Sequence, residues 1–366
     1  MTDTRVRKMA EVIAEYSLAI KERQLVLLQF EPAGFPLVEE VFRLVLKAGA
    51  HPLVRAQYQE LDEQLFRHAT DEQLSYVSDI DRLETDAIDA RLYVRASENI
   101  KGLAGVDPAK RALVIRARRP LFERYMERRG KGELASCLTQ FPTRAYAQLA
   151  GMSLVGYEEF VFQACFVDRA DPVAEWRRVS TEQQRYIDLL GKVDRLRFES
   201  EGTDLSMSVK GRKWINSDGK ANFPSGEVFT APVEDSANGR IEFDIPAIYL
   251  GQAVEGIALE FKDGRAVAAS ARQGEEFLVR MLDSDEGARV LGEAAFGLNP
   301  GITRPTGNIL FDEKIWGTVH FAVGAGYPDS GSRNKSAIHW DMIRSMKPGR
   351  VRADGRLIYE DGRFII

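Results

Sequence analysis

Histidine and cysteine are both scarce in this chain, which has only four histidines and two cysteines in 366 residues. Cys137 lies in the apolar run "ELASCLTQF" and Cys165 in "VFQACFVD". Such surroundings predict buried free thiols, which behave as small apolar side chains. Free thiols persist where the environment is reducing. The cysteines therefore indicate a protein of a reducing compartment.

Long apolar segments and a basic surplus are also missing. No segment approaches the roughly 20 apolar residues that a membrane span requires. The N-terminus mixes charged and apolar residues at a helical period, unlike the apolar core of a signal peptide. A net charge of −5 and a pI of about 5.7 argue against a nucleic-acid partner. We therefore expect a cytoplasmic protein that binds neither membranes nor nucleic acids.

The chain has enough apolar material for two folded domains. Hydrophobic residues make up 44% of the sequence and charged residues 29%, an ordinary globular composition. A length of 366 residues suggests two domains rather than one. The residue pattern changes character near 185–195. We expect an α/β scaffold domain over 1–190, including a helical middle segment, and a β-rich catalytic metal domain over 191–366.

The first half alternates predicted strands and helices. Apolar runs at 24–30, 51–57 and 90–96 are typical of buried strands, and 35–50 has a helical apolar period. This order predicts a mostly parallel sheet with helices on its faces. The segment after the first predicted strand, "QFEPAGFP", lacks the glycine-rich pattern of a phosphate loop. The sheet is therefore predicted to be a scaffold and not a nucleotide site.

The second half is predicted to be mostly antiparallel. Polar and apolar residues alternate with period two in 194–200 and 204–210, as expected of half-buried strands. Asp-Gly pairs favour tight hairpin turns because both residues tolerate positive φ. All four such pairs in the chain fall in this half: 218–219, 263–264, 354–355 and 361–362.

Two of the four histidines lie close together near the C-terminus. His320 precedes His339 by nineteen residues, and Asp341 follows two residues after His339. In a strand, His339 and Asp341 point to the same face, because side chains alternate. Imidazole with carboxylate is metal-ligand chemistry. By itself this spacing is weak evidence, since a buried histidine hydrogen-bonded to an aspartate has the same pattern.

Carboxylates in apolar surroundings strengthen the metal hypothesis. They occur in "NFPSGEVFTAPVEDSANG", "LGEAAFGLNPG" and "ILFDEKIWGTVH", which contain Glu227, Glu293, Asp312 and Glu313. A buried carboxylate is costly unless it is paired or binds a cation. Several carboxylates with two histidines exceed the needs of one structural zinc and suit a two-metal site. For each glutamate alone, a solvated charge or a surface salt bridge is the competing interpretation.

The same segments, with "NILFDEKIWGTVHFAVGAGYP" and "NKSAIHWDMI", closely resemble the aminopeptidase T family. These are cytosolic metallo-aminopeptidases, also described as thermophilic metalloproteases or leucyl aminopeptidases. The likeness extends along the whole chain, through "DPVAEW", "GTDLSMSV" and "FDIPAIYLG". It implies an α/β N-terminal domain, a β-rich metal domain and a homodimer. It also implies two divalent ions per chain: zinc, cobalt, manganese or magnesium.

The resemblance assigns roles residue by residue. The implied metal ligands are Glu227, Glu293, Glu313, His320, His339 and Asp341. Glu293 is implied as the ligand that bridges the ions and is counted with Tyr327, seven residues beyond His320, as catalytic. Between Glu313 and His320 the segment "KIWGTV" is longer by two residues than in some family members.

Three functions are compatible with these residues. The favoured hypothesis is an aminopeptidase that removes N-terminal residues from peptides with a free N-terminus, using a water activated by two metals. The alternative is a non-haem Fe(II) ring-opening dioxygenase of a dihydroxypyridine-like aromatic, using His320, His339 and Asp341. A non-catalytic binding protein with the same fold is the third. The additional carboxylates favour the aminopeptidase, because a mononuclear iron site does not need them.

Overall fold

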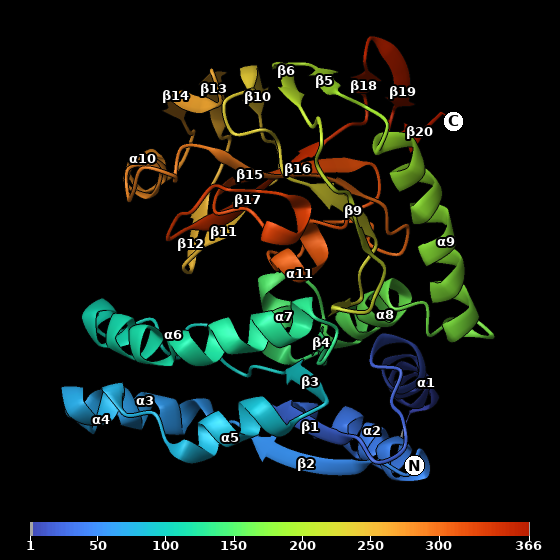
Figure 1. Ribbon diagram of the computed structural model, residues 1–366, viewed down its shortest axis with the longest axis vertical. Helices are drawn as coiled ribbons and strands as arrows, with labels where there is room; N and C mark the ends of the chain where they lie inside the picture. Colours follow the sequence, from blue (N-terminus) through green and yellow to red (C-terminus); the bar gives the residue numbers. More distant parts are fainter. Residues whose placement is uncertain (1–2, 366) are drawn as a thin grey trace. The chain divides into compact units, whose positions relative to one another are not determined.

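The computed structural model describes residues 3–365, and the chain divides into two compact units. One unit is formed by the chain up to Trp176 together with Gly219–Pro224, and the other by Arg177–Asp218 together with the chain from Ser225 onward. Figure 1 shows the helices and strands of both. Across the described residues, we find no helix with the length and apolar character that a membrane crossing demands.

The first unit contains a five-stranded sheet in which every pairing is parallel. Its order is β2-β1-β3-β4-β8, with β1 (Leu25–Phe30), β2 (His51–Ala56), β3 (Ala90–Arg95), β4 (Ala135–Gln140) and β8 (Asn222–Phe223). The predicted parallel sheet is confirmed. Its fifth strand, β8, comes from the second half of the chain and was not predicted from the local residue pattern.

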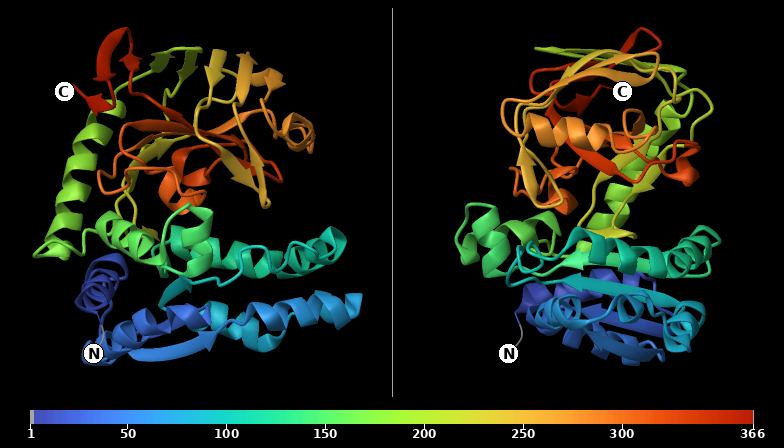
Figure 2. Two further views of the ribbon diagram at one scale, coloured as in Figure 1. Left: turned by 180° about the vertical axis from the view of Figure 1, so that it is seen from behind. Right: turned by 90° about the vertical axis from the view of Figure 1, so that its left-hand side faces the viewer.

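Helices lie on both sides of this sheet in Figures 1 and 2. They are α1 (Thr4–Val12), α2 (Phe35–Lys47), α3 (Gln59–His68), α4 (Asp71–Ser75), α5 (Asp79–Ala87), α6 (Pro108–Gly130), α7 (Arg144–Leu149) and α8 (Leu154–Ala164). The longest, α6, begins where Asp107 caps the Ala109 N–H and Pro108 occupies the first turn. Helix α9 (Pro172–Leu190) begins in this unit and continues in the other.

The second unit is built on two antiparallel sheets. The eight-stranded sheet has the order β14-β13-β10-β6-β5-β18-β19-β20, and the five-stranded sheet has the order β17-β16-β15-β9-β7. The eight strands are β5 (Arg195–Ser200), β6 (Thr203–Ser208), β10 (Asn238–Glu242), β13 (Ala258–Lys262), β14 (Arg265–Ser270), β18 (Arg350–Ala353), β19 (Arg356–Glu360) and β20 (Arg363–Phe364). The five are β7 (Ile215–Ser217), β9 (Glu227–Thr230), β15 (Leu291–Gly297), β16 (Thr318–Gly324) and β17 (His339–Ser345). Smaller elements are β11 (Ala247–Tyr249), β12 (Gln252–Val254), α10 (Glu275–Leu282) and α11 (Ile309–Asp312).

The two sheets of this unit pack against each other through aromatic side chains. Phe198 of β5 lies with its ring centroid 6.0 Å from that of Phe296 in β15 and 5.0 Å from that of Phe321 in β16. Strands β15 and β16 are buried along their whole length. Since one face of β15 and β16 fills this core, the alternate side chains occupy a second, separately buried face. The predicted β-rich, mostly antiparallel second half is confirmed.

Three of the four Asp-Gly pairs form the predicted hairpin turns. Asp263, Asp354 and Asp361 all have positive φ, as do the glycines that follow them, and they join β13 to β14, β18 to β19 and β19 to β20. The prediction is wrong for Asp218-Gly219, where only the glycine has positive φ. The strands on either side of that pair belong to different sheets, so the carboxylate of Asp218 accepts a hydrogen bond from Ser180 Oγ at 2.7 Å instead of closing a hairpin.

Both cysteines are free and buried, as predicted. They lie in the first unit, where Cys137 is part of β4 and Cys165 ends α8. Burial raises the pKa of the Cys137 thiol to about 12. A thiol that stays protonated is a poor nucleophile, so Cys137 has a packing role.

Candidate metal centre

Five of the six predicted metal ligands project from one face of the five-stranded antiparallel sheet of the second unit. They are Glu227, Glu293, His320, His339 and Asp341. The pairing register places Glu293 of β15 opposite Ala322 of β16, and Ala322 opposite Asp341 of β17. Directly paired residues of an antiparallel ladder share a face, so these three form one row. His320 lies two residues before Ala322 and therefore shares that face. The short side chain of Ala322 leaves space between the two carboxylates.

The opposite face of the same strands is the hydrophobic core. The intervening residues Phe296, Val319, Phe321, Trp340 and Met342 belong to the main apolar cluster of this unit. Strand alternation thus separates a polar face from an apolar one, as the "HWD" spacing predicted for His339, Trp340 and Asp341. The sequence did not reveal that the small side chains of Ala295 and Ala322 would lie on this face between the ligands.

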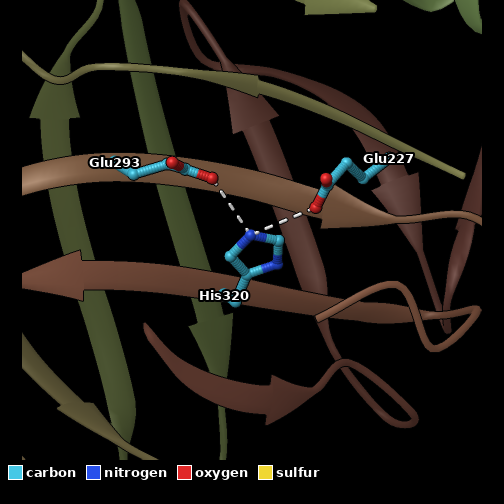
Figure 3. Close-up of side chains that lie close together, drawn as sticks. All are labelled: Glu227, Glu293 and His320. Atoms are coloured by element: carbon cyan, nitrogen blue, oxygen red, sulfur yellow. Dashed lines mark hydrogen bonds and ion pairs between the residues drawn. The ribbon is translucent and has the colours of Figure 1, made fainter. Parts of the chain in front are cut away.

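The first group of ligands joins Glu227, Glu293 and His320 (Figure 3). His320 Nε2 is 3.2 Å from Glu293 Oε1 and 3.4 Å from Glu227 Oε2. Glu227 begins β9, which pairs with β15 so that Glu227 lies opposite Gly297. All three side chains are buried, which brings two carboxylates and one imidazole together away from solvent.

A second group joins Glu293, His339 and Asp341. His339 Nε2 is 3.5 Å from Asp341 Oδ2 and 3.7 Å from Glu293 Oε2. On the other side of the ring, His339 Nδ1 lies 2.6 Å from the Ala325 carbonyl oxygen. A carbonyl only accepts, so Nδ1 carries a hydrogen, and Nε2 faces the carboxylates, where its lone pair becomes available to a metal ion when Nε2 loses its proton. Histidines that ligate metals are commonly oriented in this way.

Glu313 completes the predicted set from outside the sheet. It follows α11, and together with His320 and Asp341 it forms a third group whose ligand atoms lie within 4.8 Å of one another. The structure therefore brings all six predicted ligands together. Glu293, His320 and Asp341 each belong to two of the three groups, so the groups overlap through two carboxylates and one imidazole.

The neighbouring Asp312 takes no part in the cluster. Its Oδ1 accepts hydrogen bonds from Thr306 N at 2.7 Å and Thr306 Oγ1 at 2.8 Å, and its Oδ2 accepts one from Gly307 N at 2.8 Å. Desolvation nevertheless raises the pKa of Asp312 to about 6. A carboxylate with three such donors holds a loop in place and has little capacity left for a cation.

A buried lysine lies among the carboxylates and was not predicted. The Lys314 side chain is fully buried; its Nζ is 3.6 Å from Glu227 Oε1 and contacts Glu313 Oε1 more closely. Burial acts to lower the pKa of Lys314, but the charges of Glu227 and Glu313 outweigh it and raise the pKa. A lysine between Glu313 and the apolar Ile315 and Trp316 was the only signal in the sequence.

Tyr327 lies at the edge of the cluster. Its ring centroid is 5.2 Å from that of His339 and 5.5 Å from that of Phe229. The residue is 43% exposed, yet the desolvation of its hydroxyl is the main reason that its pKa is raised, followed by the charges of Glu293 and Asp341. Tyr327 therefore keeps its proton at neutral pH and can donate a hydrogen bond.

The charges inside the cluster shift one another's pKa values. Desolvation raises the pKa of Glu293 to about 7, although the hydrogen bond from His320 opposes the rise. Burial acts to lower the pKa of His320, but the hydrogen bond to Glu293 and the charge of Glu227 raise it to about 9. The pair therefore retains a proton near neutral pH in the metal-free protein, and a metal ion would have to displace it.

The donor set fits divalent metal ions. Glu227 Oε2, His320 Nδ1 and Asp341 Oδ1 are buried and make no hydrogen bond. A buried polar atom without a partner is costly unless something else binds the group. Carboxylate oxygens with imidazole nitrogens are ligands for zinc, cobalt and manganese. The fold and this cluster together define a metalloenzyme with a buried, sheet-borne centre.

Comparison with known proteins gives the family. The model of the thermophilic metalloprotease (M29) family matches residues 2–364, and the chain belongs to this family. Aminopeptidase 2 of Geobacillus stearothermophilus is 29% identical, covering 92% of this chain and 87% of that one. Aminopeptidase T of Thermus aquaticus is 35% identical over 55% of each chain.

A solved structure supports the assignment. Wild-type AmpT from Thermus thermophilus superposes with a TM-score of 0.85 at 25% identity and covers 99% of both chains. The resemblance to the aminopeptidase T family, the fold class and the enzyme class of metallo-aminopeptidases are thus confirmed.

Proposed function

We propose that this protein removes N-terminal residues from peptides with a free N-terminus, with two divalent ions as cofactors. One observation carries the proposal: in a chain of the M29 family, all six predicted ligands converge in three overlapping groups. Two carboxylates, Glu293 and Asp341, each belong to two of these groups, and the resemblance to the aminopeptidase T family selects Glu293 as the bridging one. A shared carboxylate is the feature that distinguishes a two-ion site from separate mononuclear sites.

The residues divide into ligands and a hydrogen-bond donor. The ligands would be Glu227, Glu293, Glu313, His320, His339 and Asp341, with Glu293 bridging. When bound, the ions supply Lewis-acid polarisation of the scissile carbonyl and lower the pKa of a water molecule toward neutrality. The Ala325 carbonyl fixes the His339 ring so that Nε2 faces the other ligands.

Tyr327 is proposed to stabilise the developing oxyanion. Its hydroxyl stays protonated because desolvation and the nearby carboxylates raise its pKa. Its ring lies against His339, so the hydroxyl belongs to the border of the metal cluster. A donor that engages the substrate only as negative charge develops raises kcat without tightening ground-state binding.

The test combines metal analysis with turnover. Metal-free protein would be saturated with zinc, cobalt, manganese or magnesium and assayed on a panel of aminoacyl substrates, with and without chelator. We expect two ions per chain at saturation, turnover of substrates with a free amine, none with acetylated ones, and loss of activity in chelator that added metal restores. One iron per chain, with oxygen uptake on an aromatic diol, would instead support the ring-opening dioxygenase.

We also propose a homodimer in the cytoplasm. Both follow from the resemblance to the aminopeptidase T family. Light scattering of the metal-loaded protein would give the mass directly, and a monomer over the micromolar range would reject the dimer.

A further inference from the structure

The lysine within the metal cluster is the feature that the proposed function leaves unexplained. Lys314 carries a positive charge into a site expected to bind positive ions. Its side chain has 0% exposure, and its Nζ contacts Glu313 Oε1 and lies 3.6 Å from Glu227 Oε1. Lys314 N and its carbonyl also bond to Phe311 O at 2.9 Å and Asn299 N at 3.0 Å, so the backbone that carries it is held at both ends.

The position of this ammonium divides the ligands into two sets. Glu227 and Glu313 face Lys314, whereas His339 forms its ion pairs with Asp341 and Glu293. Glu227 and Glu313 thus already have an ammonium as a partner, whereas the ion pairs of Glu293 and Asp341 are with imidazole rings.

Charge balance gives this division a consequence. Four carboxylates belong to the predicted ligand set, and two divalent ions alone would neutralise them. With the ammonium counted as well, the cluster carries a net charge of −1 once the first ion has bound, and the second ion brings it to +1. Like charges at such short range repel strongly in a buried environment, because solvent screens them little. The first ion can use the ligands that lie away from the ammonium, whereas the second ion meets the repulsion of both the ammonium and the first ion.

We propose that the Lys314 ammonium competes with one divalent ion for the carboxylates of Glu227 and Glu313, so that one ion binds tightly and the second weakly. This inference rests on the proposed two-metal function. Lys314 acts as a built-in cation that holds Glu227 and Glu313 in place while the weaker position is empty. Occupancy of that position then depends on the free metal concentration.

The experiment is a calorimetric titration of metal-free full-length protein with Co²⁺, followed in parallel by the visible spectrum of the bound ion. The wild type should show two steps whose dissociation constants differ at least tenfold. Lys314→Met keeps the length of the side chain and removes its charge. It should tighten the weaker step tenfold or more and leave the tighter step within about threefold.

Lys347→Met is the matched control, because Lys347 donates to the Trp316 carbonyl at 2.6 Å and, within residues 3–365, forms no ion pair with a ligand carboxylate. It should reproduce the wild-type titration. An unchanged or weakened second step in folded Lys314→Met would overturn the competition. If that variant does not fold, two equal steps in the wild type alone would overturn it.

The outcomes separate this inference from the function beneath it. Two equal, tight ions with peptide turnover would reject the role of Lys314 and keep the proposed function. No bound divalent ion in the wild type, at any concentration tested, would reject both. Two unequal ions that become equal in Lys314→Met, with Lys347→Met unchanged, support both.

Discussion

Each unit of the chain buries charged side chains, and the two do so in opposite ways. In the first unit, Arg128 donates from Nη1 to the carbonyl oxygens of Thr85 and Ile88 at 2.9 and 2.8 Å, and from Nη2 to that of Glu133 at 3.3 Å. In the second unit, Glu227, His320 and Asp341 each keep a buried polar atom without a hydrogen bond. The protein supplies hydrogen-bond acceptors for the Arg128 guanidinium, whereas it leaves polar atoms of Glu227, His320 and Asp341 without hydrogen-bond partners.

This contrast distinguishes a structural charge from a binding site. A buried charge that the protein satisfies completely stabilises one local geometry and has no capacity for a ligand. A buried group that the protein leaves unsatisfied costs free energy unless a cation binds there. Asp312 shows that the distinction does not follow the domain, because it lies beside the cluster and yet accepts three hydrogen bonds.

The largest effect is expected for Glu293→Gln. A neutral amide cannot hold two cations together, so at least one ion should be weakened and kcat/KM should fall roughly 10³-fold or more, since a metal supplies several kcal/mol of transition-state stabilisation. Kinetics and elemental analysis on the same preparation check both. The exposed Glu260→Gln is the control. Wild-type turnover with two bound ions would remove Glu293 from the site.

A smaller effect is expected for Tyr327→Phe. Loss of one oxyanion donor should lower kcat on the order of 10²–10³-fold, with KM and metal content nearly unchanged. Tyr359→Phe is the control, since the buried Tyr359 hydroxyl makes no hydrogen bond and its removal should leave kcat unchanged. A rise in KM alone would show that Tyr327 positions the substrate and does not stabilise charge.

The pH dependence should have opposite signs with and without metal. The folded-state pKa of His320 is raised from 6.5 to about 9, so its contribution to the stability of the metal-free protein is present below 6.5 and lost as pH rises through 9. A metal ion must displace that proton, so its affinity should rise up to about tenfold per pH unit over the same window. Calorimetry in two buffers of different ionisation enthalpy measures the proton release. Affinity independent of pH would show that His320 is already neutral.

The smallest effect on activity is expected for Arg128→Met. It removes three hydrogen bonds to carbonyls, and the free energy of unfolding should fall by about 2–3 kcal/mol, because bonds from charged donors are worth more than neutral ones. Metal content and kcat should stay at wild-type values. Urea unfolding measures the free energy of unfolding, and elemental analysis with kinetics measures the metal content and kcat. Loss of metal in this variant would break the distinction between structural and binding charges.

Local patterns predicted most of the fold and the membership of the metal cluster. The runs that became β1, β2 and β3 lie within a residue of their predicted limits, and His339 and Asp341 share a face as strand alternation requires. Apolar surroundings made Glu227 and Glu313 candidates, and the resemblance assigned them as ligands and gave Glu293 its bridging role. Neither source indicated Lys314. Local patterns did not distinguish Asp312 from Glu313, because their difference depends on which hydrogen-bond donors the folded chain places beside each carboxylate.

Interactions between near neighbours in the chain set the strand and helix periods, three Asp-Gly hairpins, and the two faces of β17, and these can be read from the residues. Contacts between partners far apart in the chain cannot be read in this way and appear only in the folded protein. The tertiary structure joined β8 to the parallel sheet, placed Ala322 between Glu293 and Asp341, and brought Lys314 against Glu227. The physical reason is that a residue's period fixes the direction of its side chain, whereas sheet order and register fix what that side chain meets.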